Sequence, residues 1–335
     1  MSDFSHTQTA HCENGVTVGL LSKKGLQFMN EPLAFGLGSG LFYIHIPFLK
    51  INGGPAISFR SMPGSIFKRT CKTLNVNVQR KKFRSELAAE KFLDERLDAG
   101  DIVGCQVGVY NLPYFPVAYR FHFNAHNVIV YGREGDNYLI SDPVMETTTI
   151  LTREELLKVR FAQGALAPKG HIYYPKNTPI VTDEMIRKGI IKGIKHSVRS
   201  MLYIPSRITG VRGIKHTAKK ISKWRKQLGE RKAGLFLGQI VRMQEEIGTG
   251  GGGFRFMYAA FLEQASERLA NDSLMEISNQ FTKTGDLWRD SALQMSGIYK
   301  GRITAQSEFE KSAAILFEIS ELERKAFKDL SKIRI

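Results

Sequence analysis

The fold of the amino-terminal half is decided by residues 121–143, which read FHFNAHNVIVYGREGDNYLISDP. Apolar and polar residues alternate over 121–131, and such alternation is typical of a strand with one buried face. A turn sequence at 135–137 separates this stretch from a second extended segment over 138–141. We therefore predict a β-hairpin in which His126 lies on one strand and Asp142 ends its neighbour.

The alternation also predicts where the side chains of the first strand point. If residues 121–131 are extended throughout, His122, Asn124 and His126 share one face. The Asp142 carboxylate, sixteen residues after His126, would then be placed to hold the imidazole in one tautomer. The residues alone leave the alternatives open, because a strand histidine is commonly structural and Asp-Pro commonly marks a turn.

Cys12 is the candidate nucleophile for this pair. A cysteine becomes reactive where a helix amino terminus or a nearby histidine favours its thiolate. We expect a short helix over 13–22, although Gly15 and the β-branched residues 16–18 are weak helix formers. The Cys12 backbone N–H and the Gln8 side chain are candidate oxyanion donors. An inert buried cysteine is the alternative, and it is our interpretation of Cys71 and Cys105.

The chain of 335 residues is long enough for two domains. After residue 175 the pattern changes to apolar residues at helical spacing, as over 254–269. We predict an α+β domain over 1–175 and an all-α domain over 176–335. The glycine run 250–253 before one helix is a plain loop or, alternatively, a phosphate cradle.

The net charge of +16 is concentrated in one segment. Residues 187–232 contain fifteen Lys or Arg and a single acid, Glu230, a net charge of +14. This predicts an anionic partner, and charge alone does not separate nucleic acid, an acidic membrane surface and an acidic carrier protein. A solvated basic face is the remaining alternative.

The sequence also indicates a compartment. We find no apolar run of roughly 20 residues and no basic-then-apolar leader at the amino terminus. The three cysteines are far apart and lack metal-ligand spacing, so we expect neither disulfides nor a metal site. We predict a cytoplasmic protein and leave open peripheral contact with the inner membrane surface.

Five short motifs follow one another between residues 11 and 143: His11-Cys12-Glu13, Asn30 to Gly40, Tyr110 to Tyr114, Asn124 to Gly132, and Asp142-Pro143. In this order they resemble the amino-terminal domain of the butirosin biosynthesis protein H family, over about residues 1–170. The segment 251–265, with Leu287-Trp288, is similar to the helical domain that often accompanies it.

The resemblance implies a papain-like fold with the catalytic order Cys, His, Asp. It assigns Cys12 as nucleophile, His126 as base and Asp142 as the acid that orients the base. The named member of the family moves an aminoacyl group from an acyl carrier protein to an amine. One departure lies at or near Gly108, where the family often carries Asp. If that Asp serves the substrate, recognition of the amine differs in this protein.

These implications lead to a hypothesis of an acyltransferase that moves an acyl group from an acidic acyl carrier protein to an amine-bearing small molecule or lipid. No cofactor is expected beyond the phosphopantetheine arm of that carrier. The alternatives are a cysteine peptidase or amidase of the same fold and a non-catalytic basic binding protein. A homodimer is left open, and nucleic acid is the least expected partner.

Overall fold

The computed structural model describes residues 4–51, 53–178 and 180–333. The chain forms two compact units, the first from residues 1–34 and 63–185 and the second from 35–62 and 186–335. The predicted order, an α+β region with an antiparallel sheet followed by a mainly helical region, is confirmed. The division differs from the predicted one at 175/176, because the second unit also takes in residues 35–62.

A six-stranded antiparallel sheet forms the centre of the first unit, in the order β3-β8-β4-β5-β6-β7. Its strands are β3 (Val78–Lys81), β4 (Val103–Val107), β5 (His126–Glu134), β6 (Asn137–Ser141), β7 (Thr149–Thr152) and β8 (Ile172–Pro175). The β5–β6 hairpin lies where the sequence predicts it.

The first strand of that hairpin is shorter than predicted. It begins at His126 instead of residue 121, because its neighbour β4 ends at Val107, opposite His126. The loop between β4 and β5 contains two short 3-10 helices, Val109–Asn111 and Val117–Tyr119. The expectation that His122, Asn124 and His126 share one strand face is therefore wrong.

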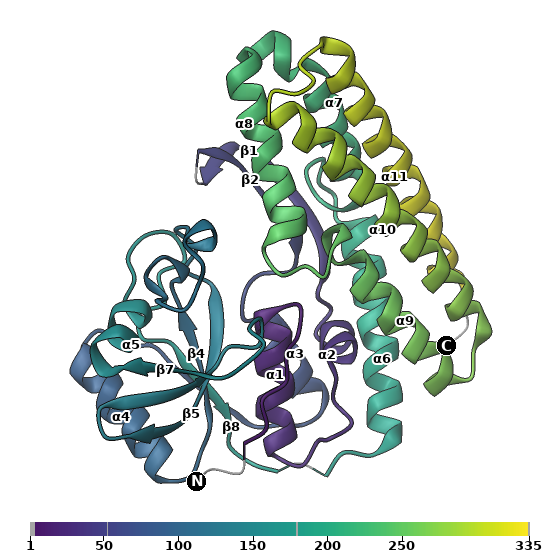
Figure 1. Cartoon of the computed structure of the whole chain (residues 1–335). Coiled ribbons are helices and arrows are strands. Elements are labelled where there is room, and N and C mark those ends of the chain that lie inside the picture. Colours follow the sequence, from purple (N-terminus) through teal and green to yellow (C-terminus); the bar gives the residue numbers. More distant parts are fainter. Residues whose placement is uncertain (1–3, 52, 179, 334–335) are drawn as a thin grey trace. The chain divides into compact units, whose positions relative to one another are not determined.

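Helices cover both faces of the sheet. Figure 1 shows α1 (Cys12–Lys23) and α3 (Ser65–Thr73) on one side, and α4 (Glu86–Asp98) and α5 (Arg153–Arg160) on the other. Within β5, Val128 and Val130 belong to a core that includes residues of α4 and α5. The neighbouring Ile129 lies against Gly19 of α1. Before the irregularity between Val130 and Gly132, the odd-numbered residues of β5 therefore face α1.

Two polar caps fix the beginnings of helices near Cys12. The His11 Nδ1 atom accepts a hydrogen bond from the Asn14 N–H at 3.4 Å, so α1 begins at Cys12 despite weak helix formers within it. Glu13, which is buried, accepts hydrogen bonds from the backbone N–H groups of Gly64 and Ile66, each at 2.9 Å, at the start of α3.

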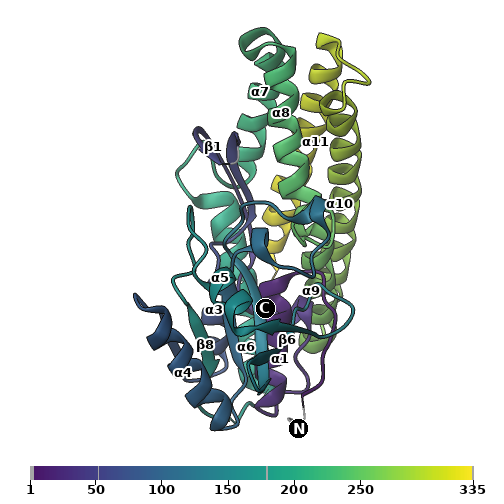
Figure 2. The same cartoon turned by 60° about the vertical axis from the view of Figure 1, so that its left-hand side comes forward.

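The second unit contains six long helices and one β-hairpin among its described residues. They are α6 (Asp183–Val198), α7 (Gly210–Leu228), α8 (Glu230–Val241), α9 (Arg255–Leu269), α10 (Asp272–Tyr299), α11 (Gln306–Lys332), β1 (Leu41–Ile51) and β2 (Gly54–Arg60). A further helix, α2 (Glu31–Leu37), leads into this unit. Figure 2 shows α7, α8, α10 and α11 running side by side.

Aromatic packing explains why residues 35–62 belong with the helices. The Phe59 ring packs edge-on against Trp288 with a centroid distance of 5.2 Å, and Phe35 stacks on Phe254 at 5.1 Å. The Tyr43 hydroxyl donates a hydrogen bond to Thr217 of α7 at 2.8 Å. The hairpin thus completes the core of the helical unit.

An ion pair lies at the centre of this core. Arg255 and Glu323, both with no exposed side-chain surface, are joined by two hydrogen bonds of 2.8 and 3.0 Å. The Trp288 indole N–H donates to the same carboxylate at 2.7 Å. Arg255 belongs to the segment 251–265 that resembles the accompanying helical domain, so this segment has a structural role here.

The glycine run itself forms a tight loop in which Gly250, Gly251, Gly252 and Gly253 all have positive φ. The Gly252 N–H donates to the Glu245 carboxylate at 3.1 Å. A carboxylate of the chain therefore occupies an amide that a bound phosphate would need, and this favours the plain loop. Among the residues described, we find no helix both long and apolar enough to cross a bilayer.

Candidate active site

Cys12 is the first residue of α1, and hydrogen bonds to Glu31 fix the backbone of the two residues before it. The Glu31 carboxylate accepts hydrogen bonds from the backbone N–H groups of Ala10 and His11, at 2.9 and 2.7 Å. The Cys12 N–H has no hydrogen-bond partner within the described part of the chain, as expected for the first turn of a helix. A free amide and the positive end of the helix dipole thus lie at the sulfur.

His126 and Asp142 form a direct, buried pair. The His126 Nε2 atom lies 2.7 Å from the Asp142 Oδ2 atom, and both side chains are less than 7% exposed. Since Nε2 is committed to the carboxylate, Nδ1 is the ring nitrogen that remains for the cysteine. The pair joins the first residue of β5 to the residue that follows β6.

The electrostatics link Cys12 to this pair. Burial by itself lowers the pKa of His126, but the Asp142 charge and the Cys12 sulfur, which also hydrogen-bonds the imidazole, raise it to about 10. The imidazole therefore stays protonated at neutral pH. The structure thus brings together the three residues that the sequence pointed to, with the imidazole bonded to the Asp142 carboxyl group and to the Cys12 sulfur.

The loop before β5 provides side chains to which the sequence analysis assigned no role in the site. The Tyr114 hydroxyl donates to the Asp142 Oδ2 atom at 2.9 Å, and the Phe115 ring packs edge-on against the imidazole at 5.3 Å. The Val144 N–H donates to the other carboxylate oxygen at 3.2 Å. Asp142 is therefore held on both oxygens, and the ring of His126 is held against an aromatic wall.

The segment before Cys12 also supports Asp142. The His6 ring lies 2.8 Å from the Ser141 hydroxyl and 3.1 Å from the Met145 carbonyl. The Thr9 N–H donates to the Pro143 carbonyl at 2.6 Å. The residues that precede the candidate nucleophile are thus bonded to those on either side of the candidate acid.

Asn127 is a further residue that the sequence did not single out. Its side-chain Nδ2 atom lies 3.8 Å from the Cys12 sulfur. Alternation along β5 could have identified it, because the residue after His126 points to the opposite face of the sheet. If the helix that begins at Cys12 packs on that face, Asn127 lies near the sulfur.

Comparisons with known proteins show the family to which the chain belongs. The model described as "Domain of unknown function (DUF4872)" matches residues 154–330, more than half of the chain. The chain belongs to the DUF4872 family. The model "Butirosin biosynthesis protein H, N-terminal" matches residues 11–143, which contain Cys12, His126 and Asp142. The resemblance stated from the motifs is thereby confirmed.

The other comparisons add little to this assignment. No curated protein matches the chain. Among solved structures, one described as a C39-like peptidase from Bacillus anthracis is 13% identical, with a TM-score of 0.37. The match covers 54% of this chain and 98% of that one.

Several predicted candidates lie elsewhere in this family member. His122 is exposed in the loop before β5, where its ring stacks on Tyr110 at 4.2 Å. Gln8 is exposed and makes no hydrogen bond to any described residue. Burial raises the pKa of Cys71 to about 12 and also raises that of Cys105, so both remain protonated thiols.

Gly108 has no space for a side chain. A Cβ atom there would lie 2.7 Å from the Asn124 side-chain oxygen and 2.5 Å from the Ala162 methyl group. Asn124 in turn donates to the Gln163 and Ala165 carbonyls, each at 3.0 Å. The Asn124 amide therefore fills the space beside Gly108.

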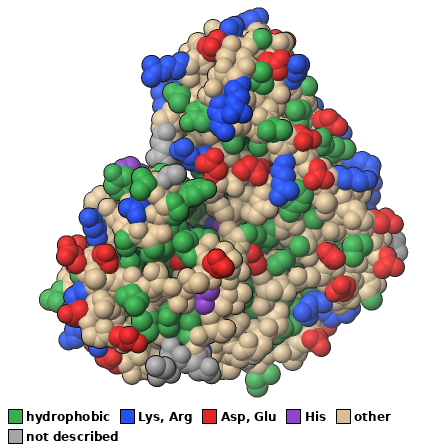
Figure 3. Space-filling model, in the orientation of Figure 1, with side chains coloured by type: hydrophobic (Ala, Val, Ile, Leu, Met, Phe, Trp, Pro, Cys, Tyr) green, Lys and Arg blue, Asp and Glu red, His purple; other side chains and the backbone are tan. Residues whose placement is uncertain are grey.

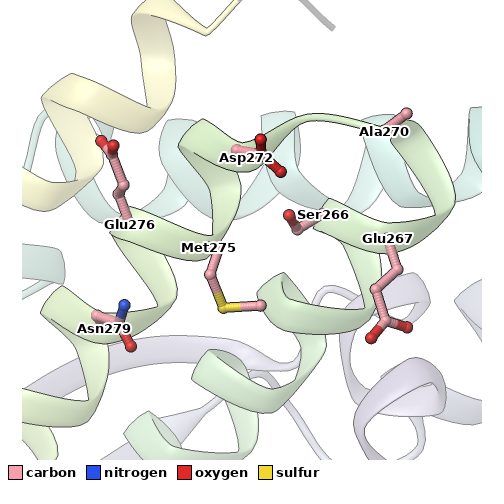
Figure 4. A pocket seen from close by; sticks show the side chains of 7 residues that line it. All are labelled: Ser266, Glu267, Ala270, Asp272, Met275, Glu276 and Asn279. Carbon is pink, nitrogen blue, oxygen red and sulfur yellow. The ribbon is translucent and has the colours of Figure 1, made fainter.

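No group of three or more His, Cys, Asp or Glu residues is arranged to hold a metal in the described ranges. A pocket at the turn between α9 and α10 is lined by seven residues: Ser266, Glu267, Ala270, Asp272, Met275, Glu276 and Asn279. Figure 4 shows that its three carboxylates point in different directions. The lining includes no cysteine and no histidine that could activate the Ser266 hydroxyl, so this pocket does not compete with Cys12 as the reactive site.

Proposed function

We propose that the protein is a cysteine-dependent acyltransferase, which takes an acyl group from a carrier-protein thioester and transfers it to an amine. The observation that carries the proposal is the arrangement of Cys12 beside the imidazole whose Nε2 atom lies 2.7 Å from Asp142. Residues 11–143 match a domain model that is named after a biosynthetic protein. This match favours group transfer over the degradation of proteins.

The first half-reaction exchanges one thioester for another. The Cys12 thiolate attacks the acyl carbon, and the Cys12 backbone N–H donates to the oxyanion. The bond from the acyl carbon to the pantetheine sulfur breaks, and the imidazolium of His126 gives its proton to that leaving sulfur. An acyl-enzyme on Cys12 and a neutral imidazole remain.

The second half-reaction restores the ion pair. The acceptor amine attacks the acyl carbon, a carbon–nitrogen bond forms, and the bond to the Cys12 sulfur breaks. His126 accepts the proton of the amine and becomes an imidazolium again, which Asp142 stabilises. Formation of an amide from a thioester is energetically favourable and drives the overall reaction forward.

A basic stripe on α7 supports an acidic carrier as the donor. Five exposed cations recur at intervals of three or four residues along this helix: Arg212, Lys215, Lys219, Lys223 and Lys226. This spacing places them on one face over roughly 21 Å. Only Lys215 has an acidic partner among the described residues, namely Glu321 at 3.0 Å. Figure 3 shows Lys and Arg side chains over the end of the unit where α8 follows α7.

This stripe, in which four of the five cations lack an acidic partner among the described residues, is complementary to an acidic protein surface. We propose the acyl carrier protein as the partner of this stripe, because the proposed reaction requires a carrier-bound donor. A lipid surface is the competing possibility, and the acceptor amine belongs to a small molecule or a lipid. The site of reaction in this proposal requires neither metal nor cofactor of its own.

Intact-mass measurement after mixing with an acyl-carrier thioester tests the proposal. The wild type should gain the mass of one acyl group, which an added amine should remove, while Cys12→Ala should gain none. Release of product from peptides without any adduct from thioesters would instead identify a peptidase or amidase. Salt-dependent binding of DNA or lipid that is unchanged in Cys12→Ala, with no acyl adduct in the wild type, would identify a non-catalytic binding protein.

A further inference from the structure

The Asn127 side chain is fixed by three contacts around the candidate nucleophile. Its Oδ1 atom accepts a hydrogen bond from the Tyr173 hydroxyl at 2.8 Å. Its Nδ2 atom donates to the Ala125 carbonyl at 3.0 Å and to the Cys12 sulfur at 3.8 Å. Asn127 is 4% exposed, so solvent does not supply alternative partners.

These contacts permit one orientation of the amide only. The Ala125 carbonyl can accept but not donate, so a flipped amide would bring two oxygen acceptors together. Tyr173 supplies the matching donor on the other side, and burial raises its pKa well above the usual value, so its hydroxyl remains protonated. The N–H group of Asn127 is therefore held toward the sulfur.

Two adjacent residues of β5 contact the same sulfur. His126 is the first residue of the strand, and its imidazole hydrogen-bonds Cys12. Asn127 points to the opposite face, on which Ile129 lies against α1. The sulfur thus has a cationic donor on one side and a neutral donor on another.

We propose that Asn127, oriented by Tyr173, is a built-in hydrogen-bond donor to the Cys12 thiolate. A donor to the charged form favours that form. The amide carries no charge, so it stabilises the thiolate without competing with the imidazolium for a proton. When the sulfur becomes acylated it loses its charge and accepts this bond poorly, so the donor favours the free enzyme that receives the next acyl group.

The test measures how the rate of iodoacetamide alkylation at Cys12 depends on pH, with the labelled peptide identified by mass. Alkylation needs no acyl substrate. Cys71 and Cys105 have no exposed surface and raised pKa values, so we expect them to stay unlabelled and to serve as internal controls. We expect Asn127→Ala and Tyr173→Phe to raise the pH midpoint by roughly half to one unit, or about three- to tenfold slower labelling below the midpoint. Asn127→Asp keeps the size but replaces the donor with a negative charge, and it should raise the midpoint most.

Asn124→Ala is the matched control. Asn124 is also a buried amide, three residues earlier in the chain, but it bonds carbonyls of residues 163 and 165 instead of the sulfur. It should leave the midpoint unchanged. If Asn127→Ala does not fold, Asn127→Asp and Tyr173→Phe decide the matter, and a wild-type midpoint in those two variants would overturn the proposal.

The inference rests on the proposed nucleophilic role of Cys12, yet the two fail separately. If the wild type forms no acyl-enzyme but the midpoint shifts as expected, acyl transfer is refuted and the donor role stands. If the acyl-enzyme forms and the midpoint is the same in all Asn127 variants, the donor role is refuted alone.

Discussion

Tyr114 donates its hydroxyl hydrogen to the same oxygen of Asp142 that binds His126, at 2.9 Å. The carboxylate is therefore aimed from two directions, and the phenol accounts for one motif shared with the family. In Tyr114→Phe, we expect acyl-enzyme formation to slow by roughly five- to tenfold, the equivalent of one buried hydrogen bond. Stopped-flow or quenched intact-mass measurement would show this, with Tyr119→Phe, an exposed tyrosine of the same loop, as the control.

Asp142→Asn should move the alkaline limit of reactivity toward neutral pH. Burial lowers the pKa of His126, and the Asp142 charge is the largest influence that raises it, to about 10. A group with a raised pKa keeps its proton until the pH passes that value, so removal of the carboxylate charge makes the imidazolium lose its proton at lower pH. The pH profile of Cys12 alkylation measures this limit. An unchanged alkaline limit would show that Asp142 does not control the charge of His126.

Arg255→Met should destabilise the helical unit by about 3–5 kcal/mol, because it leaves the Glu323 carboxylate buried and unpaired. The double variant Arg255→Met with Glu323→Leu removes both charges and should recover much of that loss. Urea denaturation followed by circular dichroism compares the three proteins. Equal stability of the single and double variants would mean that the two charges are not coupled.

Reversal of charge on the basic stripe should weaken the use of the carrier. In Lys219→Glu with Lys223→Glu, we expect KM for the acyl-carrier donor to rise by about tenfold at low salt, with kcat unchanged. A short pantetheine thioester without the protein should react at the wild-type rate. The control reverses Lys91 and Lys158, exposed cations of α4 and α5, and changes the net charge equally.

The kinetics of the stripe variant distinguish the two anionic partners. An unchanged KM for the carrier would refute the docking surface. If the same variant instead loses sedimentation with phosphatidylglycerol vesicles, the stripe faces a lipid surface. A KM that rises equally for the short thioester would place the effect at the reaction site and not at the carrier.

The sequence predicts the candidate catalytic residues better than it predicts the residues that hold them in place by hydrogen bonds. Cys12, His126 and Asp142 stand in motifs whose order indicated a family, and the hairpin that joins the last two follows from alternation and a turn. Glu31 and Glu13 stood in the same motifs, but their partners are backbone N–H groups of distant or irregular segments. Nothing in a pattern of side chains reports which backbone amides lack a partner.

Two further differences have physical causes that lie outside local sequence. Residues 121–125 alternate like a strand, yet they remain a loop because no neighbouring strand extends far enough to pair with them. Residues 35–62 belong to the helical unit because Phe59 and Tyr43 find their partners on α10 and α7. Both outcomes depend on contacts between segments far apart in the chain.

Residues 35–62 belong to the second unit but interrupt the sequence of the first, and this limits where the chain can be divided. A fragment that ends at residue 175 would carry Tyr43 and Phe59 without Thr217 and Trp288, and would expose their apolar faces to water. The remaining fragment would lack part of its own interior. Neither half of this polypeptide is thus a self-sufficient piece, and anyone who wishes to study one alone must graft or delete the hairpin first.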